Sequence, residues 1–308
     1  MNKLKNIAMI AFAGLALTAC NNDEPQIENV GIKIIARING EETRANSEGK
    51  GDKFLPGDII QLTTSGDYYP YITNEGTVDG VATFVPKTDA TVQYANFRNF
   101  GAYLDNGDER NSLEKFYIPE DQSSVEKLRK ADYIATHSGS YYYPGTQVQT
   151  SLSKEQTVYL DFAHLLSKVT VVISEYSNNM SNVNVGELTP TDATIYSRTT
   201  YIHIGNDDYI IEISPLITQD KTNGNHKFTA IISPCRYSEG DTFMKFKFDG
   251  IEYTVKVNSE LSNMWFSPGK HYIINLKLNG KLSVSPSKVT IADWEEGGSY
   301  TTNLINLL

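Results

Sequence analysis

The sequence predicts an all-β protein made of two tandem antiparallel β-sandwiches. Apolar residues alternate with polar residues along several segments, Asp-Gly and Asn-Gly dipeptides separate these segments, and helical patterns are scarce. The chain also contains 19 tyrosines and 12 phenylalanines, which favour strands. Its length of 308 residues favours two domains over one.

The first 19 residues are typical of a lipoprotein signal peptide. Two lysines precede an apolar run over residues 7–17, and Leu17-Thr18-Ala19-Cys20 follows. The run is too short to cross a bilayer core of about 30 Å as a helix. Cleavage between Ala19 and Cys20 would leave Cys20 to carry acyl chains, each methylene of which adds about 0.8 kcal/mol to membrane binding. A secretory signal that happens to precede a cysteine is the alternative.

Residues 20–45 are expected to form a polar tether and then a first strand. Gly31 to Ile38 alternates in polarity and ends at Asn39-Gly40, so four apolar side chains share one face. The polar segment Glu41 to Asp52 is expected to be exposed, and it contains Arg44.

The body of the chain is expected to divide at about residues 155 and 156. An N-terminal sandwich would occupy 46–155 and a C-terminal sandwich 156–308. In the first, Asp79-Gly80 predicts a hairpin turn, and Ser124–Ala131 predicts a short helix with Ser123 and Glu126 spaced as a capping box. The polar segment Asp105–Asn111 and the segment Tyr141–Gly145 predict loops.

Two hairpins are expected in the second half. Met244–Phe248 and Ile251–Val257 alternate in polarity on either side of Asp249-Gly250, which suits a type I′ turn. Tyr272–Leu278 alternates in the same way before Asn279-Gly280, with Leu282 and Val284 as the expected return strand.

Composition and motifs argue against several classes of function. The formal net charge of −10 disfavours nucleic acid and anionic lipid surfaces as partners. With Cys20 lipidated, Cys235 is the one cysteine left, so no intrachain disulfide is expected. The sequence has no nucleophile elbow, no His-Glu-x-x-His and no phosphate-binding loop, and its five histidines form no local pair. We expect no catalytic site, no cofactor and no metal, and a hydrolase is the least favoured interpretation.

Two ligand-binding alternatives remain. Acidic residues within 105–109 offer carboxylates to calcium, but their spacing fits no EF-hand and a solvated loop is favoured. Tyr68, Tyr69 and Tyr71, or Tyr141–Tyr143, offer rings on which sugars stack. A monomeric, surface-anchored glycan-binding lipoprotein is therefore the alternative function.

Seven motifs stand in a fixed order along nearly the whole mature chain. They are the lipobox at Cys20, Glu42-Thr43-Arg44-Ala45, Phe54-Leu55-Pro56-Gly57-Asp58-Ile59-Ile60, Ala131-Asp132-Tyr133-Ile134-Ala135, Leu160-Asp161-Phe162-Ala163-His164-Leu165-Leu166-Ser167-Lys168-Val169, Pro268-Gly269-Lys270-His271-Tyr272 and Ile291-Ala292-Asp293-Trp294. Together they resemble the fimbrillin family, the lipoprotein-derived pilus subunits of Bacteroides-type bacteria.

The resemblance implies a fold, a location and an assembly mechanism. Members have two transthyretin-like sandwiches and are not enzymes. They reach the outer-membrane surface as lipoproteins and then enter the fimbrium. An arginine-specific protease removes the first strand with its lipid, and the vacated groove accepts the C-terminal strand of another subunit. The implied partners are other fimbrial subunits, outer-membrane lipid through Cys20 before processing, and a host or glycan ligand.

The resemblance assigns cleavage to the bond between Arg44 and Ala45. Cleavage there would release Cys20–Arg44 together with the first strand. Arg37 also lies nearby, but within the strand, where pairing would shield it. An ordinary loop arginine is the alternative for Arg44.

The resemblance also draws attention to the segment Tyr300–Leu308. It is either the donor strand or the strand that closes its own sandwich. Its apolar residues are Leu304, Ile305, Leu307 and Leu308. Shaft, anchor and tip roles are not distinguished by these residues.

Overall fold

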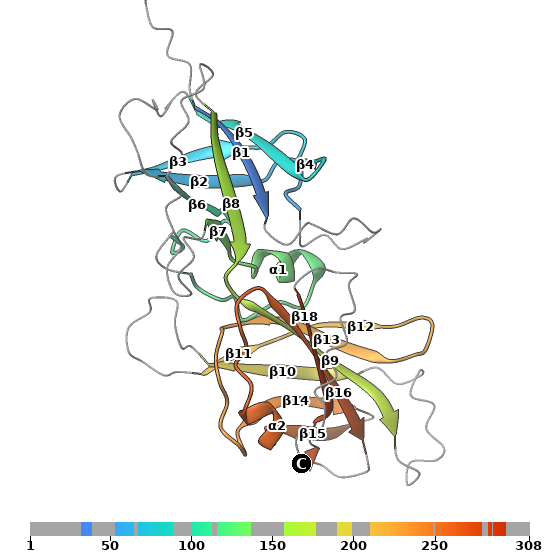
Figure 1. The fold of residues 1–308 in the computed structure, drawn as a ribbon. Helices are drawn as coiled ribbons and strands as arrows, with labels where there is room; N and C mark the ends of the chain where they lie inside the picture. Colours follow the sequence, from blue (N-terminus) through green and yellow to red (C-terminus); the bar gives the residue numbers. More distant parts are fainter. Residues whose placement is uncertain are drawn as a thin grey trace, which may run out of the picture. The chain divides into compact units, whose positions relative to one another are not determined.

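The structure is all-β with two short helices. It is a computed structural model, and it describes residues 32–38, 53–64, 67–88, 100–112, 116–136, 157–176, 190–198, 210–248, 250–278, 283–284 and 286–293. Within these ranges the strands form one eight-stranded sheet and two five-stranded sheets (Figure 1). The predicted all-β class is confirmed.

The eight-stranded sheet closes on itself as a barrel. Its strands are β1 (Lys33–Ile38), β2 (Ile59–Thr64), β3 (Asp67–Ile72), β4 (Thr77–Val78), β5 (Val81–Pro86), β6 (Gly101–Leu104), β7 (Ile134–Thr136) and β8 (Thr157–His164), in the order β1-β8-β7-β6-β2-β3-β5-β4. Because β1 also pairs with β5, seven strands form a ring, and β4 flanks β5 on the side away from β1. The expected tandem transthyretin-like sandwiches are not confirmed, since this sheet encloses its own core.

Side chains from around the ring fill the barrel. A small barrel leaves room inside only for the inward-facing residue of each alternate position. The interior cluster consists of Ile32, Ile34, Ala36, Ile38, Phe54, Ile60, Leu62, Tyr71, Ala82, Phe84, Phe100, Ala102, Leu104, Ile134, Val158, Leu160 and Phe162. The four apolar residues predicted to share one face of the first strand are all in it.

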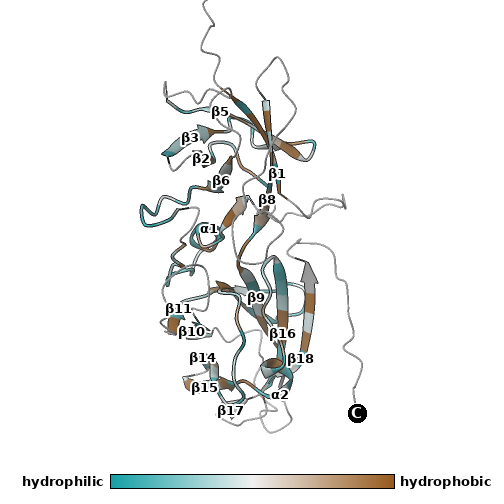
Figure 2. Ribbon diagram, turned by 60° about the vertical axis from the view of Figure 1, so that its left-hand side comes forward, coloured by the Kyte–Doolittle hydropathy of each residue, from teal (hydrophilic) through white to brown (hydrophobic). Residues whose placement is uncertain are grey.

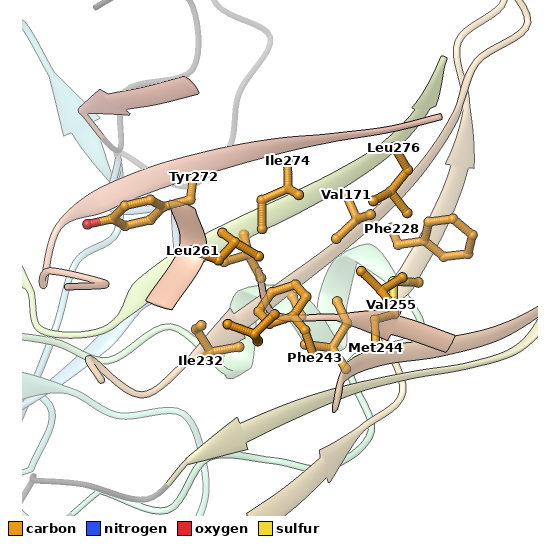
Figure 3. Close-up of a cluster of buried hydrophobic side chains, with 14 of the residues drawn as sticks. Val171, Phe228, Ile232, Phe243, Met244, Val255, Leu261, Tyr272, Ile274 and Leu276 are labelled. Atoms are coloured by element: carbon orange, nitrogen blue, oxygen red, sulfur yellow. The ribbon is translucent and has the colours of Figure 1, made fainter. Parts of the chain in front are cut away.

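The two five-stranded sheets share a second core. One contains β10 (Thr191–Arg198), β11 (Ile210–Ile213), β14 (Thr242–Phe248), β15 (Ile251–Lys256) and β17 (Ser283–Val284); the other contains β9 (Ser167–Tyr176), β12 (Leu216–Gln219), β13 (His226–Ile232), β16 (Lys270–Leu278) and β18 (Pro286–Asp293). Figure 3 shows Val171 and Ile274 of one sheet facing Met244 and Val255 of the other. The alternation that produces this core is visible as teal and brown along β16 (Figure 2).

The chain passes from the barrel to this pair of sheets between β8 and β9, at Leu165 and Leu166. The predicted domain boundaries at residues 45 and 155 lie outside the described residues and stay predictions.

Two of the three expected hairpins form. β4 and β5 are joined by Asp79 and Gly80, whose φ angles of 50° and 82° are those of a type I′ turn. β14 and β15 pair with Phe248 opposite Ile251, as predicted. The third expectation is wrong: β17 pairs in parallel with β15, and β16 pairs with β18 and β9 instead.

The predicted helix is α1 (Val125–Lys130), and α2 (Ser259–Ser262) is a single turn that was not predicted. The N-cap of α1 is Ser124, whose hydroxyl accepts from the Lys127 backbone N–H at 3.2 Å. Ser123, expected as the cap, instead donates through its hydroxyl and its backbone N–H to Asp121. Asp121 offers a carboxylate two residues away, and this local turn wins over the capping box.

Candidate functional site

The first strand is the element that closes the barrel. β1 runs parallel to β8 over six positions, from Lys33 opposite Thr157 to Ile38 opposite Phe162. On its other side it runs antiparallel to β5 over three positions, with Ile34 opposite Phe84 and Ala36 opposite Ala82. Without β1, both β5 and β8 would present unpaired backbone groups, which are templates for another strand.

The inner face of β1 is dry. Ile34 and Ala36 are fully buried, Ile38 is 3% exposed, and Ile32, directly before the strand, is also fully buried. Burying an isoleucine side chain stabilises a fold by about 1.5–3 kcal/mol, so the three isoleucines together contribute roughly 5–9 kcal/mol. This inner face is a continuous part of the barrel core, and its loss would expose that core along the length of the strand.

The outer face of β1 is polar and holds one ion pair. Arg37 reaches across to its register neighbour Asp161 on β8, with Nε–Oδ1 and Nη2–Oδ2 distances of 2.6 and 3.3 Å. The Arg37 side chain is 60% exposed, so this pair adds little stability in water. The alternation of β1 fixes its register, because a shift of β1 by one residue would move Arg37 to the inner face and the isoleucines to the outer face.

Phe54 fills the barrel next to β1. Its ring lies edge-on to Phe84 of β5 at a centroid distance of 5.1 Å and to Phe162 of β8 at 5.3 Å. Its backbone is tied to Thr77 of β4 in both directions: Phe54 N donates to Thr77 Oγ1 at 3.0 Å, and Thr77 N donates to Phe54 O at 2.8 Å. The two strands that flank β1 are therefore bridged inside the barrel by one ring.

The turn after Phe54 holds it in place. Asp58 accepts from the Leu55 backbone N–H at 2.8 Å, and Gly57 has a φ of 87°, which favours glycine. Arg129 of α1 donates to Asp58 Oδ1 at 2.6 Å, in a pair where Asp58 is only 11% exposed. The motif Phe54-Leu55-Pro56-Gly57-Asp58 is thus a rigid turn that places one ring beside β1.

The C-terminal end of β8 carries a buried histidine–aspartate pair. His164 Nδ1 lies 2.8 Å from Asp132 Oδ2, and both side chains are about 95% buried, with 4% and 5% exposed. A few residues on, the Gly269 backbone N–H donates to Leu166 O at 2.8 Å. Three of the quoted motifs therefore meet at the junction of β8 and β9, where they hold the strand that pairs with β1.

The comparisons with known proteins place the chain in a family. A family model described as fimbrillin-like matches residues 43–294. The chain belongs to the fimbrillin-like family. No match is found among the curated proteins.

Two of the following solved structures share the fold of this fimbrillin-like chain, and the third is a weaker match. A candidate cell adhesion protein from Bacteroides uniformis is 17% identical, with a TM-score of 0.52 and coverage of 86% of this chain and 98% of that one. Another from Bacteroides ovatus is 15% identical, with a TM-score of 0.54 and coverage of 87% and 99%. The tip fimbrial protein Mfa3 from Porphyromonas gingivalis, truncated at its C-terminus, is 11% identical with a TM-score of 0.42 and coverage of 86% and 100%.

Several predicted site residues of the fimbrillin-like chain lie outside the described residues. These are Ala19, Cys20, Arg44, Ala45 and the segment 300–308 with Leu304, Ile305, Leu307 and Leu308. Lipidation, cleavage and strand donation therefore stay predictions. The first strand, by contrast, is present as β1, with Arg37 paired inside it. Sequence reasoning missed that β1 closes a barrel, since no local pattern shows which distant strands will flank it.

The tyrosines considered for sugar stacking do not form one platform. Along β3, Tyr68 is 43% exposed, whereas Tyr71 is fully buried and Tyr69 packs against the barrel core. Alternation in a strand sends neighbouring side chains to opposite faces, so only Tyr68 of this group points outward. Tyr141–Tyr143 lie outside the described residues.

Two carboxylates of the acidic loop after β6 accept hydrogen bonds from protein side chains. Arg110 donates to Asp108 and holds the pKa of that carboxyl below its ordinary value, while Gln61 donates to Asp105 at 2.7 Å. Burial raises the pKa of Tyr103 to about 12, helped by Asp105 and by Tyr68.

Among the residues that the structure describes, no three histidine, cysteine or acidic side chains gather in a way that could hold a metal ion. The same ranges contain no helix both long and apolar enough to span a membrane.

Proposed function

We propose that this chain is a non-enzymatic structural subunit of a cell-surface fimbria that assembles by strand exchange. The observation that carries the proposal is that β1, the first strand that the structure describes, is also the strand that closes the barrel. Family membership and the likeness to candidate cell adhesion proteins support the fimbrial role. In this proposal the precursor is exported as a lipoprotein anchored through Cys20 in the outer membrane.

The position of Arg44 suits a cut that releases β1 alone. A break between Arg44 and Ala45 would separate residues 20–44 from the rest, and β1 is the one described strand within that segment. All other strands of the barrel remain in the second fragment. Cleavage would make β1 a separate segment between β5 and β8, so that an incoming strand of suitable pattern can take its place.

The segment Tyr300–Leu308 is the proposed donor. It carries Leu304, Ile305, Leu307 and Leu308, which supply apolar side chains to a dry groove. The partners would be other fimbrial subunits, and a host or glycan ligand belongs to the assembled fimbria in this proposal.

The test is limited digestion of the purified lipid-free precursor with an arginine-specific protease. We expect a new N-terminus at Ala45 and a ladder of oligomers on SDS gels of unboiled samples. The variant Arg44→Lys should abolish both, whereas the matched variant Arg37→Lys should leave both intact. A new N-terminus elsewhere, or cleavage at Arg44 that leaves only monomers, would contradict the proposal.

A further inference from the structure

The inner face of β1 contains one small side chain among large ones. Ile34 and Ile38 of the strand and Ile32 directly before it are large, but the inward residue between Ile34 and Ile38 is the small Ala36. Its register partner on β5 is Ala82, which is also fully buried. Because both side chains are small, these two alanines leave more room inside the barrel than their larger neighbours do.

Register and hydrogen bonds place the backbone of Phe54 in line with these two alanines. Thr77 pairs with Ala82 on the side of β5 opposite Ala36, and the backbone of Phe54 bonds to Thr77 in both directions. Phe54 therefore starts from the row of residues that contains Ala82 and Ala36.

The ring contacts give the same position independently. Phe84 lies opposite Ile34, and Phe162 lies opposite Ile38. The Phe54 ring touches both of these rings, at 5.1 and 5.3 Å, so it lies at a level between Ile34 and Ile38. That level is the level of Ala36.

Phe54 has little freedom to move away. A Cβ built on Gly76 would come within 2.5 Å of the Phe54 carbonyl oxygen, which shows how closely the neighbouring turn is packed against its backbone. The ring is 98% buried, with 2% exposed, between two other phenylalanines. Dense interiors of this kind accept added atoms only with strain.

We propose that position 36 determines which strands can occupy the place of β1: a small side chain is accepted there, and a large one is rejected by Phe54. This inference rests on the proposed function, and it defines the class of partner strand. The occupant runs parallel to β8 and antiparallel to β5, with large apolar residues at the positions of Ile34 and Ile38. Between them it carries a side chain no larger than threonine, a pattern that Tyr300, Thr302 and Leu304 of the proposed donor offer.

A double-mutant cycle on the full chain tests the contact without any strand exchange. Ala36→Leu and Phe54→Ala should each lower the free energy of unfolding in urea, and the double variant should lose less than the sum of the two losses. Ala230→Leu is the matched control, since Ala230 is buried in the other core and Phe54→Ala should not rescue it. Additive losses for Ala36→Leu and Phe54→Ala would overturn the inference.

Peptide competition then tests the specificity itself. Peptides of residues 32–38 carrying alanine, serine or leucine at position 36 are offered to the chain cut at Arg44, and their incorporation is measured. Leucine at position 36 should weaken incorporation at least about tenfold, the ratio that ~1.4 kcal/mol of overpacking produces, whereas leucine at the outward position 35 should not. Equal incorporation of the alanine and leucine peptides would refute the specificity. If no peptide is incorporated, the proposed function fails, and the double-mutant cycle still decides whether Phe54 lies over Ala36.

Discussion

Replacing one inward isoleucine of β1 measures how strongly the strand is held. Ile34 is fully buried between Phe84 and Val158 in register, whereas the next residue, Ile35, is half-buried on the outer face between Thr83 and Tyr159. Ile34→Ala removes three carbon atoms, worth about 0.8 kcal/mol each in transfer, or roughly 2.4 kcal/mol. The cavity left in a packed barrel raises the expected loss to about 3–4 kcal/mol.

The assay for this prediction is urea unfolding of Ile34→Ala beside Ile35→Ala. Both variants remove the same atoms from the same strand, so strand propensity cancels between them. Ile35→Ala should cost below about 1 kcal/mol because its side chain stays partly in water. Equal losses, or a larger loss for Ile35→Ala, would refute the assignment of the inner and outer faces.

Three further perturbations probe other parts of the fold. Burial, together with Lys168, lowers the pKa of His271 from 6.5 to about 3. Because the unfolded chain binds this proton at a higher pH than the folded chain, stability should fall as pH drops from about 6.5 towards 3. His271→Gln should flatten this slope when urea midpoints are measured against pH. The Cys235 thiol is fully buried and should react with a maleimide only after unfolding, and rapid labelling of the native chain would contradict its burial. Gly107→Ala should cost about 1–2 kcal/mol of left-handed strain, since its Cβ meets open space. Gly76→Ala should cost more because its Cβ also meets the Phe54 backbone, and equal thermal shifts for the two would contradict this.

The sequence was informative wherever structure is decided by neighbours in the chain. Alternation identified the inner face of β1, and two-residue turns identified the β4–β5 and β14–β15 hairpins. The same logic failed for β17, which follows β16 closely but pairs with β15. A turn dipeptide permits a hairpin. The sheet that a two-residue strand joins depends instead on long-range packing, which the dipeptide does not show.

For the same reason, only part of the candidate site could be predicted from the sequence. The alternation of residues 32–38 predicts a strand with one apolar face, and this is what β1 shows. Its neighbour β8 begins at Thr157, far along the chain, and a parallel pairing leaves no turn signal between the strands. Barrel closure and the contacts of the Phe54 ring with Phe84 and Phe162 are long-range features of this kind, so they emerge only from the fold.

The energy held by β1 has a consequence for how an exchange proceeds. Its three buried isoleucines contribute roughly 5–9 kcal/mol, which is comparable with the whole stability of a typical domain, about 5–15 kcal/mol. A barrel without any occupant would therefore be close to unfolding. We expect the segment 20–44 to stay bound after cleavage at Arg44 and to leave only as another strand enters.

Two measurements distinguish displacement from spontaneous release. The cut chain should elute together with the segment 20–44 in gel filtration when no competing strand is present. When a peptide of residues 32–38 is added in excess, the release rate should rise with its concentration, because the incoming strand takes over the pairing with β5 and β8 step by step. A release rate independent of peptide concentration would mean that β1 dissociates first and that the open barrel survives long enough to wait for a partner. In that case the burial of Ile32, Ile34 and Ile38 would contribute far less than their exposure values imply.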